Sequence, residues 1–335
     1  MYIVKAKSGE EGAAMLKPRR LRQGDTVGLV SPSSGPWKRS ELWRGIAALE
    51  SWGFQVKVGA HAYDRHYDYA GLDAERAADL IWAFDHPGID AVFCSQGGIG
   101  AARLPRLLDF DVIRGNPKIF LGYSDITALH LAIAREADLV TFHGPSLAGF
   151  DPESMTAYKK DLLLRALTGD EPLGEIKMAD PDKYLLKINA GRVQGPLVGG
   201  NLTLVCAGLG TPWEIRTEGC ILFLEELETE PWQMDHLLTH LLNAGKLEAA
   251  RGIVIGECLD CEPRKLDPGS FNQRSLEDIL FELLEPLGHP VLYGLPLGHT
   301  KDRATLPLGV AVTLDTAEGF FRIDEVATTN GKEKS

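Results

Sequence analysis

A serine stands where a predicted strand meets a predicted helix, in the stretch Gly122-Tyr123-Ser124-Asp125. The apolar run before it is typical of a buried strand, and the residues after it have the composition of a helix. Such a corner exposes the serine hydroxyl and directs the backbone N–H of Asp125 toward an oxygen that becomes negative during nucleophilic attack. The same position also suits a serine that only caps the helix. The local sequence leaves both interpretations open.

A glycine-rich turn, Gln96-Gly97-Gly98-Ile99-Gly100, follows another apolar strand. Glycines let a backbone approach a ligand closely and present its N–H groups as donors, and an ordinary tight turn is the alternative. The turn also begins the dinucleotide pattern G-x-G-x-x-G, but an arginine at position 103 replaces its last glycine. The first predicted strand, after which this fingerprint normally comes, ends in SPSSG instead. An NAD site is therefore disfavoured.

Two carboxylates, Glu225 and Glu226, come directly after an apolar strand. Solvation of a strand end is the usual reason for such a pair, and strand alternation sends the two side chains to opposite faces. Of the nine histidines, His299 lies in a glycine-flanked loop after a strand, and His143 in TFHGP has a similar setting. Ser124, Glu225 and His299 supply the residue types of a serine hydrolase triad, but chain order alone does not define one.

Two possible metal motifs are incomplete. Cys258 and Cys261 form a lone CxxC, and no second ligand pair stands at a matching spacing. His236 and His240 are four residues apart on a predicted helix, but the motif H-L-L-T-H lacks the glutamate of H-E-x-x-H. The sequence therefore favours no metal site.

Composition excludes several classes of function. The chain has 335 residues and a formal net charge of −12, with 44% hydrophobic and 24% charged residues, as in soluble globular proteins. The acidic balance argues against a nucleic-acid partner, and no apolar stretch approaches the roughly 20 residues that cross a membrane. The N-terminus lacks the apolar region of a signal peptide, and the five cysteines have no framework spacing. We therefore expect a cytoplasmic protein.

Alternating strand and helix signals must position these groups. Short apolar strands separated by helices of ten or more residues predict an α/β fold with a parallel sheet covered on both faces. In such sheets, functional groups gather beyond the carboxyl ends of the strands. We predict an N-terminal extension over residues 1–20, a domain with the candidate nucleophile over 21–165, a linker over 166–194, and a C-terminal domain over 195–330, of α/β or α+β class, that contains the glutamate and the histidine.

Taken together, these motifs resemble the LD-carboxypeptidase family of serine peptidases, which includes muropeptide LD-carboxypeptidases and microcin C self-immunity peptidases. The resemblance runs from about Leu21 to Asp315. It rests on six short motifs in the family's order, namely SPSSG (31–35), GGIG (97–100), GYSDIT (122–127), GPLVGGNLTLV (195–205), LFLEE (222–226) and LPLGHTKDRATLPLG (295–309).

The resemblance implies a flavodoxin-like N-terminal domain, a C-terminal domain with a swivelling β/α core, and often a homodimer. Ser124 would be the nucleophile and His299 the general base, oriented by Glu225. Backbone N–H groups of Asp125, Gly97 and Gly98 would form the oxyanion hole. Asn201 and Gln96 would lie near the substrate. The reaction would hydrolyse an amide bond through an acyl-enzyme, without a metal or organic cofactor.

One departure concerns the substrate. Many LD-carboxypeptidases carry Arg-Gly-Gly-Tyr-Gly where this chain has Gln96-Gly97-Gly98-Ile99-Gly100, so a cation that could hold an anionic substrate is missing. The leading hypothesis is release of terminal D-alanine from muropeptides during cell-wall recycling. The alternative is cleavage of a peptidyl- or aminoacyl-nucleotide amide, as in the immunity peptidases. A non-catalytic ligand-binding module is a lesser alternative.

Overall fold

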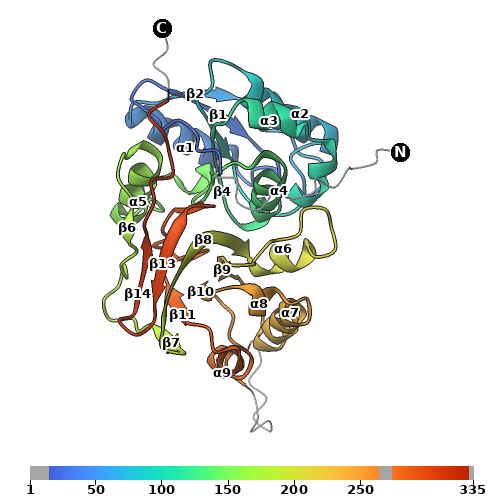
Figure 1. Ribbon diagram of the computed structural model, residues 1–335. Helices are drawn as coiled ribbons and strands as arrows, with labels where there is room; N and C mark the ends of the chain where they lie inside the picture. The colour runs from blue at the N-terminus through green and yellow to red at the C-terminus, as the bar shows by residue number, and fades with distance from the viewer. Residues whose placement is uncertain (1–14, 264–273, 332–335) are drawn as a thin grey trace.

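Residues 15–263 and 274–331 are described by the computed structural model, and they form a six-stranded and an eight-stranded β-sheet. Figure 1 shows the two sheets in separate halves of the molecule, the first sheet with the N-terminal helices and the second with helices α7, α8 and α9. The predicted α/β class and the predicted parallel N-terminal sheet are confirmed.

The six-stranded sheet has the order β12-β5-β4-β3-β1-β2. All neighbours in it are parallel except the antiparallel pair of β12 and β5. The run β2-β1-β3-β4-β5 is the flavodoxin-like order, whose switch point lies between β1 and β3. Its strands are β1 (Thr26–Val30), β2 (Gln55–Val58), β3 (Ala91–Cys94), β4 (Ile119–Gly122), β5 (Thr141–His143) and β12 (Leu306–Leu308).

Both faces of the central strands β1, β3 and β4 are buried, which explains why these strands are largely apolar, whereas the edge strand β2 alternates between exposed and half-buried residues. Successive side chains of a strand point to opposite faces, so Leu29 and Phe93 pack on one side while Val30 and Val92 pack on the other. Helices α1 (Arg39–Ser51) and α5 (Ala157–Thr168) contribute to the first of these cores, and α2 (Asp73–Asp85), α3 (Phe110–Gly115) and α4 (Thr127–Ala137) to the second.

The eight-stranded sheet has the order β6-β14-β13-β8-β9-β10-β11-β7, with a parallel centre from β8 to β11 and antiparallel edges. Its strands are β6 (Gly174–Glu175), β7 (Leu186–Ile188), β8 (Arg192–Asn201), β9 (Ile221–Glu225), β10 (Gly252–Gly256), β11 (Val291–Leu295), β13 (Ala311–Asp315) and β14 (Phe320–Ile323). Its helices are α6 (Leu202–Ala207), α7 (Pro231–Asn243), α8 (Lys246–Ala249) and α9 (Leu276–Leu284).

The two halves share one hydrophobic core. Phe223 of β9 and Val254 of β10 belong to the same buried cluster as Leu29 and Phe93 of the first sheet. Their strand neighbours, such as Leu224, point the other way into a separate core beneath α6, α7 and α9. Because apolar packing joins the halves, loops from both sheets are held at a fixed junction.

Three segments differ in detail from the expected organisation. The predicted linker over 166–194 contains β6 and β7, which pair at the two edges of the second sheet. Strand β12 comes from the C-terminal half yet joins the first sheet beside β5. Of the predicted extension, residues 1–14 lie outside the described residues, whereas Leu16 forms a bridge with Leu139 and is therefore part of the fold.

Candidate active site

Ser124 lies directly after β4, at the first residue of the single turn η3 (Ser124–Ile126) that leads into α4. Its φ of 64° is in the left-handed region, where a non-glycine residue is strained. Neither η3 nor α4 has a side-chain cap at its start, so the interpretation of this serine as a helix cap is wrong. Within residues 15–263 and 274–331, the structure gives its hydroxyl no hydrogen-bond partner. The corner therefore presents an uncommitted hydroxyl.

The glycine turn after β3 passes directly against this serine. A Cβ atom at Gly97 would lie 2.9 Å from Cβ and 3.2 Å from Oγ of Ser124. Gly98 has a φ of 112°, and a side chain there would overlap the hydroxyl of Ser34. That hydroxyl accepts a 3.1 Å hydrogen bond from the N–H of Ile99. Gly97 is thus required for the close approach of the turn to Ser124, and Gly98 for its close approach to Ser34.

Asp125 ties together the loops that follow three parallel strands. Its Oδ2 accepts a 2.5 Å hydrogen bond from the Ser33 hydroxyl and a 2.7 Å bond from the N–H of Ala101. The side chain is 4% exposed, and burial raises the pKa of the carboxyl above its usual value. The carboxyl therefore fixes the loops after β1 and β3 against the corner that carries Ser124.

Glu225 and His299 form a hydrogen-bonded pair at the end of the second sheet. Glu225 Oε2 lies 2.7 Å from His299 Nδ1, and the glutamate is 1% exposed. A side chain at Gly298, whose φ is 86°, would overlap the Glu225 carboxylate, so the glycine lets the histidine loop close over the acid. Because an ionised carboxylate only accepts, Nδ1 carries the proton and Nε2 is left as the basic nitrogen.

Glu226 points away from this pair. Its oxygens accept four hydrogen bonds, from Asn201 Nδ2, the N–H and hydroxyl of Thr203, and the N–H of Leu227. Asn201, which we expected near the substrate, uses its Oδ1 to cap α6 through the N–H of Leu204. Glu226 and Asn201 are therefore committed to holding the start of α6.

The serine and histidine halves of the site meet at Tyr123. The ring centroid of Tyr123 lies 4.9 Å from that of His299, and the guanidinium of Arg303 lies 4.3 Å above the same ring. Because Tyr123 precedes Ser124 in the chain, these contacts bring the loop 299–303 to the corner after β4. The junction contains residues from both sheets.

His143, the rival of His299 in the sequence, is placed differently. It lies in β5, is 2% exposed, and packs against Phe223 at a centroid distance of 5.1 Å. Neither of its ring nitrogens has a hydrogen-bond partner, and burial lowers the pKa of the imidazole well below its usual value. A neutral imidazole without a carboxylate partner fits a packing role better than that of a general base.

A pocket of about 180 Å³ lies beside the candidate nucleophile. Gly97 and Tyr123, which flank Ser124 in space and in sequence, contribute to its wall. Gln96 also lines it and donates a 2.8 Å hydrogen bond from Nε2 to the carbonyl of Gly35. A small substrate group bound here would lie next to the serine.

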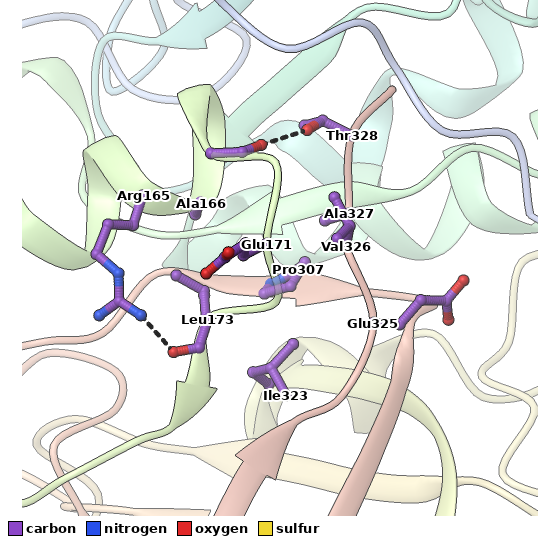
Figure 2. A pocket seen from close by; sticks show the side chains of 11 residues that line it. Arg165, Ala166, Glu171, Leu173, Pro307, Ile323, Glu325, Val326, Ala327 and Thr328 are labelled. Atoms are coloured by element: carbon purple, nitrogen blue, oxygen red, sulfur yellow. Dashed lines mark hydrogen bonds between the residues drawn. The ribbon is translucent and has the colours of Figure 1, made fainter. Parts of the chain in front are cut away.

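A second hollow lies between α5 and the C-terminal segment, where Figure 2 shows Arg165, Leu173 and Thr328 around it. Its volume of about 10 Å³ is at the lower limit for a single water molecule. Arg165 donates a 2.6 Å hydrogen bond to the carbonyl of Leu173 across it. This hollow is therefore too small to receive a peptide.

Of the incomplete metal motifs, the cysteine pair lies close to one triad candidate, because Cys258 and Glu225 line the same small hollow. Cys258 and Cys261 are free thiols, and a hydrogen bond between them is the main factor that raises the pKa of Cys258. Within the described part of the chain, the only group with metal-ligand spacing is His61, Asp64 and Glu75, where His61 Nδ1 already lies 2.7 Å from Asp64. None of these groups approaches Ser124 through a contact in the structure.

Family comparisons match both halves of the chain. The model of the LD-carboxypeptidase N-terminal domain covers residues 27–144, and that of the LD-carboxypeptidase C-terminal domain covers residues 194–314. The first match contains the corner with Ser124. The second contains the loop with His299.

Individual relatives and a solved structure are similar to the chain over most of its length. A probable murein peptide carboxypeptidase of Bacillus subtilis (strain 168) is 39% identical, over 90% of this chain and 92% of the relative. The microcin C7 self-immunity protein MccF of Escherichia coli is 31% identical, over 88% of this chain and 92% of its own. A solved structure of MccF in complex with aspartyl sulfamoyl adenosine has a TM-score of 0.83 and 26% identity, covering 94% of this chain and all of MccF.

Proposed function

The chain belongs to the LD-carboxypeptidase family and is a serine-type carboxypeptidase, and on that premise we propose that it releases terminal D-alanine from muropeptides in cell-wall recycling. The observation that supports the proposal best is the buried pair of Glu225 and His299 at the junction with the Ser124 corner. The substrate is supported by the murein peptide carboxypeptidase that is 39% identical over most of its length.

We assign the catalytic roles as follows. Ser124 attacks the carbonyl carbon of the scissile amide, and Nε2 of His299 accepts the hydroxyl proton. Glu225 keeps the proton on Nδ1 and stabilises the imidazolium that forms, since its carboxylate lies 2.7 Å away. The left-handed backbone of Ser124 supports this assignment, because strained corners of this kind present nucleophiles.

The developing oxyanion needs donors that are already in position. The N–H groups of Asp125, Gly97 and Gly98 are the candidates, and the close approach of Gly97 to the serine supports their role. His299 then protonates the leaving amine, the D-amino acid departs, and a water molecule activated by the same imidazole hydrolyses the acyl-enzyme. No step of this sequence calls for a metal or an organic cofactor.

The experiment compares two substrates. Purified protein should release D-alanine from an L,D-linked muropeptide tetrapeptide much faster than it cleaves an aminoacyl-sulfamoyl adenylate, with both reactions followed by mass spectrometry. The reverse preference would instead establish the immunity-type activity. That alternative is favoured by the 31% identity to MccF and by Gln96 and Ile99 at the positions of the family's arginine and tyrosine. Failure to cleave either compound would support the non-catalytic binding module.

We also propose that the protein acts in the cytoplasm as a homodimer, without nucleic-acid or membrane partners. All five cysteines are free thiols, which suits a reducing compartment. Among the described residues, no helix has both the length and the apolar character that a membrane crossing requires. Trp37 and Trp43 are 71% and 60% exposed in the single chain, which suits an interface between copies. Sedimentation equilibrium tests the dimer.

A further inference from the structure

The pocket beside Ser124 carries a charge opposite to that of the whole chain. The chain has a formal net charge of −12, yet the pocket lining includes the cations Arg303 and Lys159 and no acidic residue. Gly97 and Tyr123 in the same lining place the pocket on one side of the candidate nucleophile. A small anionic group is the ligand that this lining would attract.

Arg303 is held firmly by the loop that carries the histidine. Its Nε donates a 3.1 Å hydrogen bond to the carbonyl of Thr300, and one terminal nitrogen donates a 3.2 Å bond to the carbonyl of His299. The guanidinium also stacks over Tyr123. These contacts orient the group but leave its charge unbalanced, because within the described residues it forms no ion pair.

Lys159 reaches the pocket from α5, and it is only 4% exposed. In the described part of the chain, its Nζ has neither a hydrogen-bond partner nor an ion-pair partner. Burial, followed by the repulsion from Arg303, lowers the pKa of the ammonium group to about 8. Asp302 and Asp151 oppose this shift from a distance, but neither forms an ion pair with the ammonium group. Two buried or half-buried cations that repel each other and have no ion-pair partner among the described residues form a built anion site.

We propose that Arg303 and Lys159 bind the α-carboxylate of the C-terminal residue that the enzyme releases. The inference rests on the proposed carboxypeptidase function, in which this carboxylate is three bonds from the scissile carbonyl carbon. A group so close to the reacting atom must lie in a pocket adjoining Ser124, as this one does. The two cations also compensate for Gln96, which lines the same pocket where many relatives carry an arginine.

The test pairs a charge-removing variant with a charge-removing substrate. Lys159→Met keeps the apolar stem and removes the ammonium, and Lys160→Met is the matched control, since Lys160 lies over the ring of Trp52 instead of lining the pocket. Each protein is assayed with an L,D-linked tetrapeptide and with the same peptide as its C-terminal carboxamide. Lys159→Met should lower kcat/KM for the free acid about 10- to 100-fold, mainly through KM. The carboxamide should be cleaved equally by Lys159→Met and the wild type.

Arg303→Gln is a second test of the carboxylate site, because glutamine retains a donor for the loop carbonyls while losing the charge. The same selective loss for the free acid is expected. Equal losses for acid and carboxamide, or no loss in either variant, would overturn the inference while leaving the carboxypeptidase function intact. Thermal denaturation of each variant shows whether it is folded.

Failure of the proposed function is recognised separately. If the wild type cleaves neither peptide, calorimetric titration of D-alanine into the wild type and Lys159→Met decides whether the carboxylate site exists. An affinity for D-alanine that is about tenfold or more weaker in Lys159→Met would support the anion site. Equal affinity of the two proteins for D-alanine, or no binding to either, would contradict the anion site.

Discussion

Glu225 and Glu226 are adjacent and both buried, yet the structure gives them different partners, which makes them a matched pair for substitution. Glu225→Gln removes the charge beside His299 without changing the size of the side chain. Glu226→Gln makes the same chemical change one residue later, where the carboxylate holds Asn201 and Thr203. We predict that the first change affects catalysis and the second affects stability.

The catalytic loss follows from the geometry of the pair. Charge centres about 4 Å apart in surroundings with an effective dielectric constant of about 20 attract each other by about 4 kcal/mol. The attraction exists only while His299 is an imidazolium, so losing it raises the barrier to proton transfer. About 4 kcal/mol corresponds to a fall in kcat/KM of about 10³-fold. The melting temperature should change little, because Glu225→Gln removes a buried charge whose Oε1 has no partner.

The loss of stability in Glu226→Gln follows from the hydrogen bonds that this glutamate accepts. Each oxygen of Glu226 accepts two hydrogen bonds, so the amide of Glu226→Gln must turn its NH₂ toward two donors. The loss of these charge-assisted bonds should cost about 3 kcal/mol of unfolding free energy. Activity measured well below the melting temperature should stay within about tenfold of wild type, because a folded variant retains the Glu225–His299 pair.

The assay combines steady-state release of the C-terminal amino acid with urea denaturation of both variants. If Glu225→Gln kept more than a tenth of wild-type kcat/KM, the glutamate would not support the histidine as reasoned. If Glu226→Gln lost as much activity as Glu225→Gln while remaining folded, the division of roles between the two carboxylates would be wrong.

Three further predictions concern the glycines and a buried histidine. Gly97→Ala places a methyl group 2.9 Å from Cβ of Ser124, so kcat/KM should fall about 10²-fold with little change in melting temperature. Wild-type activity in this variant would contradict the close approach of the turn to the serine. Gly298→Ala should push the Glu225 carboxylate from the histidine and lower kcat/KM by at least about 10²-fold, which a crystal structure of the variant can check. Burial lowers the pKa of His130 to about 4 from the 6.5 of the unfolded chain, so between these values the unfolded state binds the extra proton. The contribution of His130 to the free energy of unfolding should therefore be fully present above pH 6.5 and fall by roughly 3 kcal/mol as the pH drops toward 4. In urea titrations at several pH values, His130→Gln should show a weaker dependence of the unfolding free energy on pH.

The parallel sheet and the loops at its carboxyl ends could be predicted because the signals are local. Apolar runs such as residues 119–121 are buried on both faces, and helices of regular period separate them. The left-handed backbone of Ser124 could not be predicted, because serine has no general preference for positive φ and the strain is imposed by packing around the corner. Its catalytic role stays a prediction that the experiments above address.

Tertiary contacts decided what the sequence pattern left open. Alternation predicts that Glu225 and Glu226 face opposite ways, but which one meets His299 depends on a loop that comes more than 70 residues later. Lys159 and Lys160 are equivalent in the sequence, and only the packing of α5 turns one toward the pocket and the other over Trp52. Strand β12 is three residues long and too short to show a period.

The central claim is that Ser124 is the nucleophile of a carboxypeptidase, and the most direct measurement is the rate of D-alanine release from an L,D-linked tetrapeptide by wild type and Ser124→Ala. Both proteins should be shown to be folded by thermal denaturation before the comparison. We predict release by the wild type and a loss of at least about 10³-fold in kcat for Ser124→Ala. Wild-type activity in the folded Ser124→Ala protein would contradict the assignment.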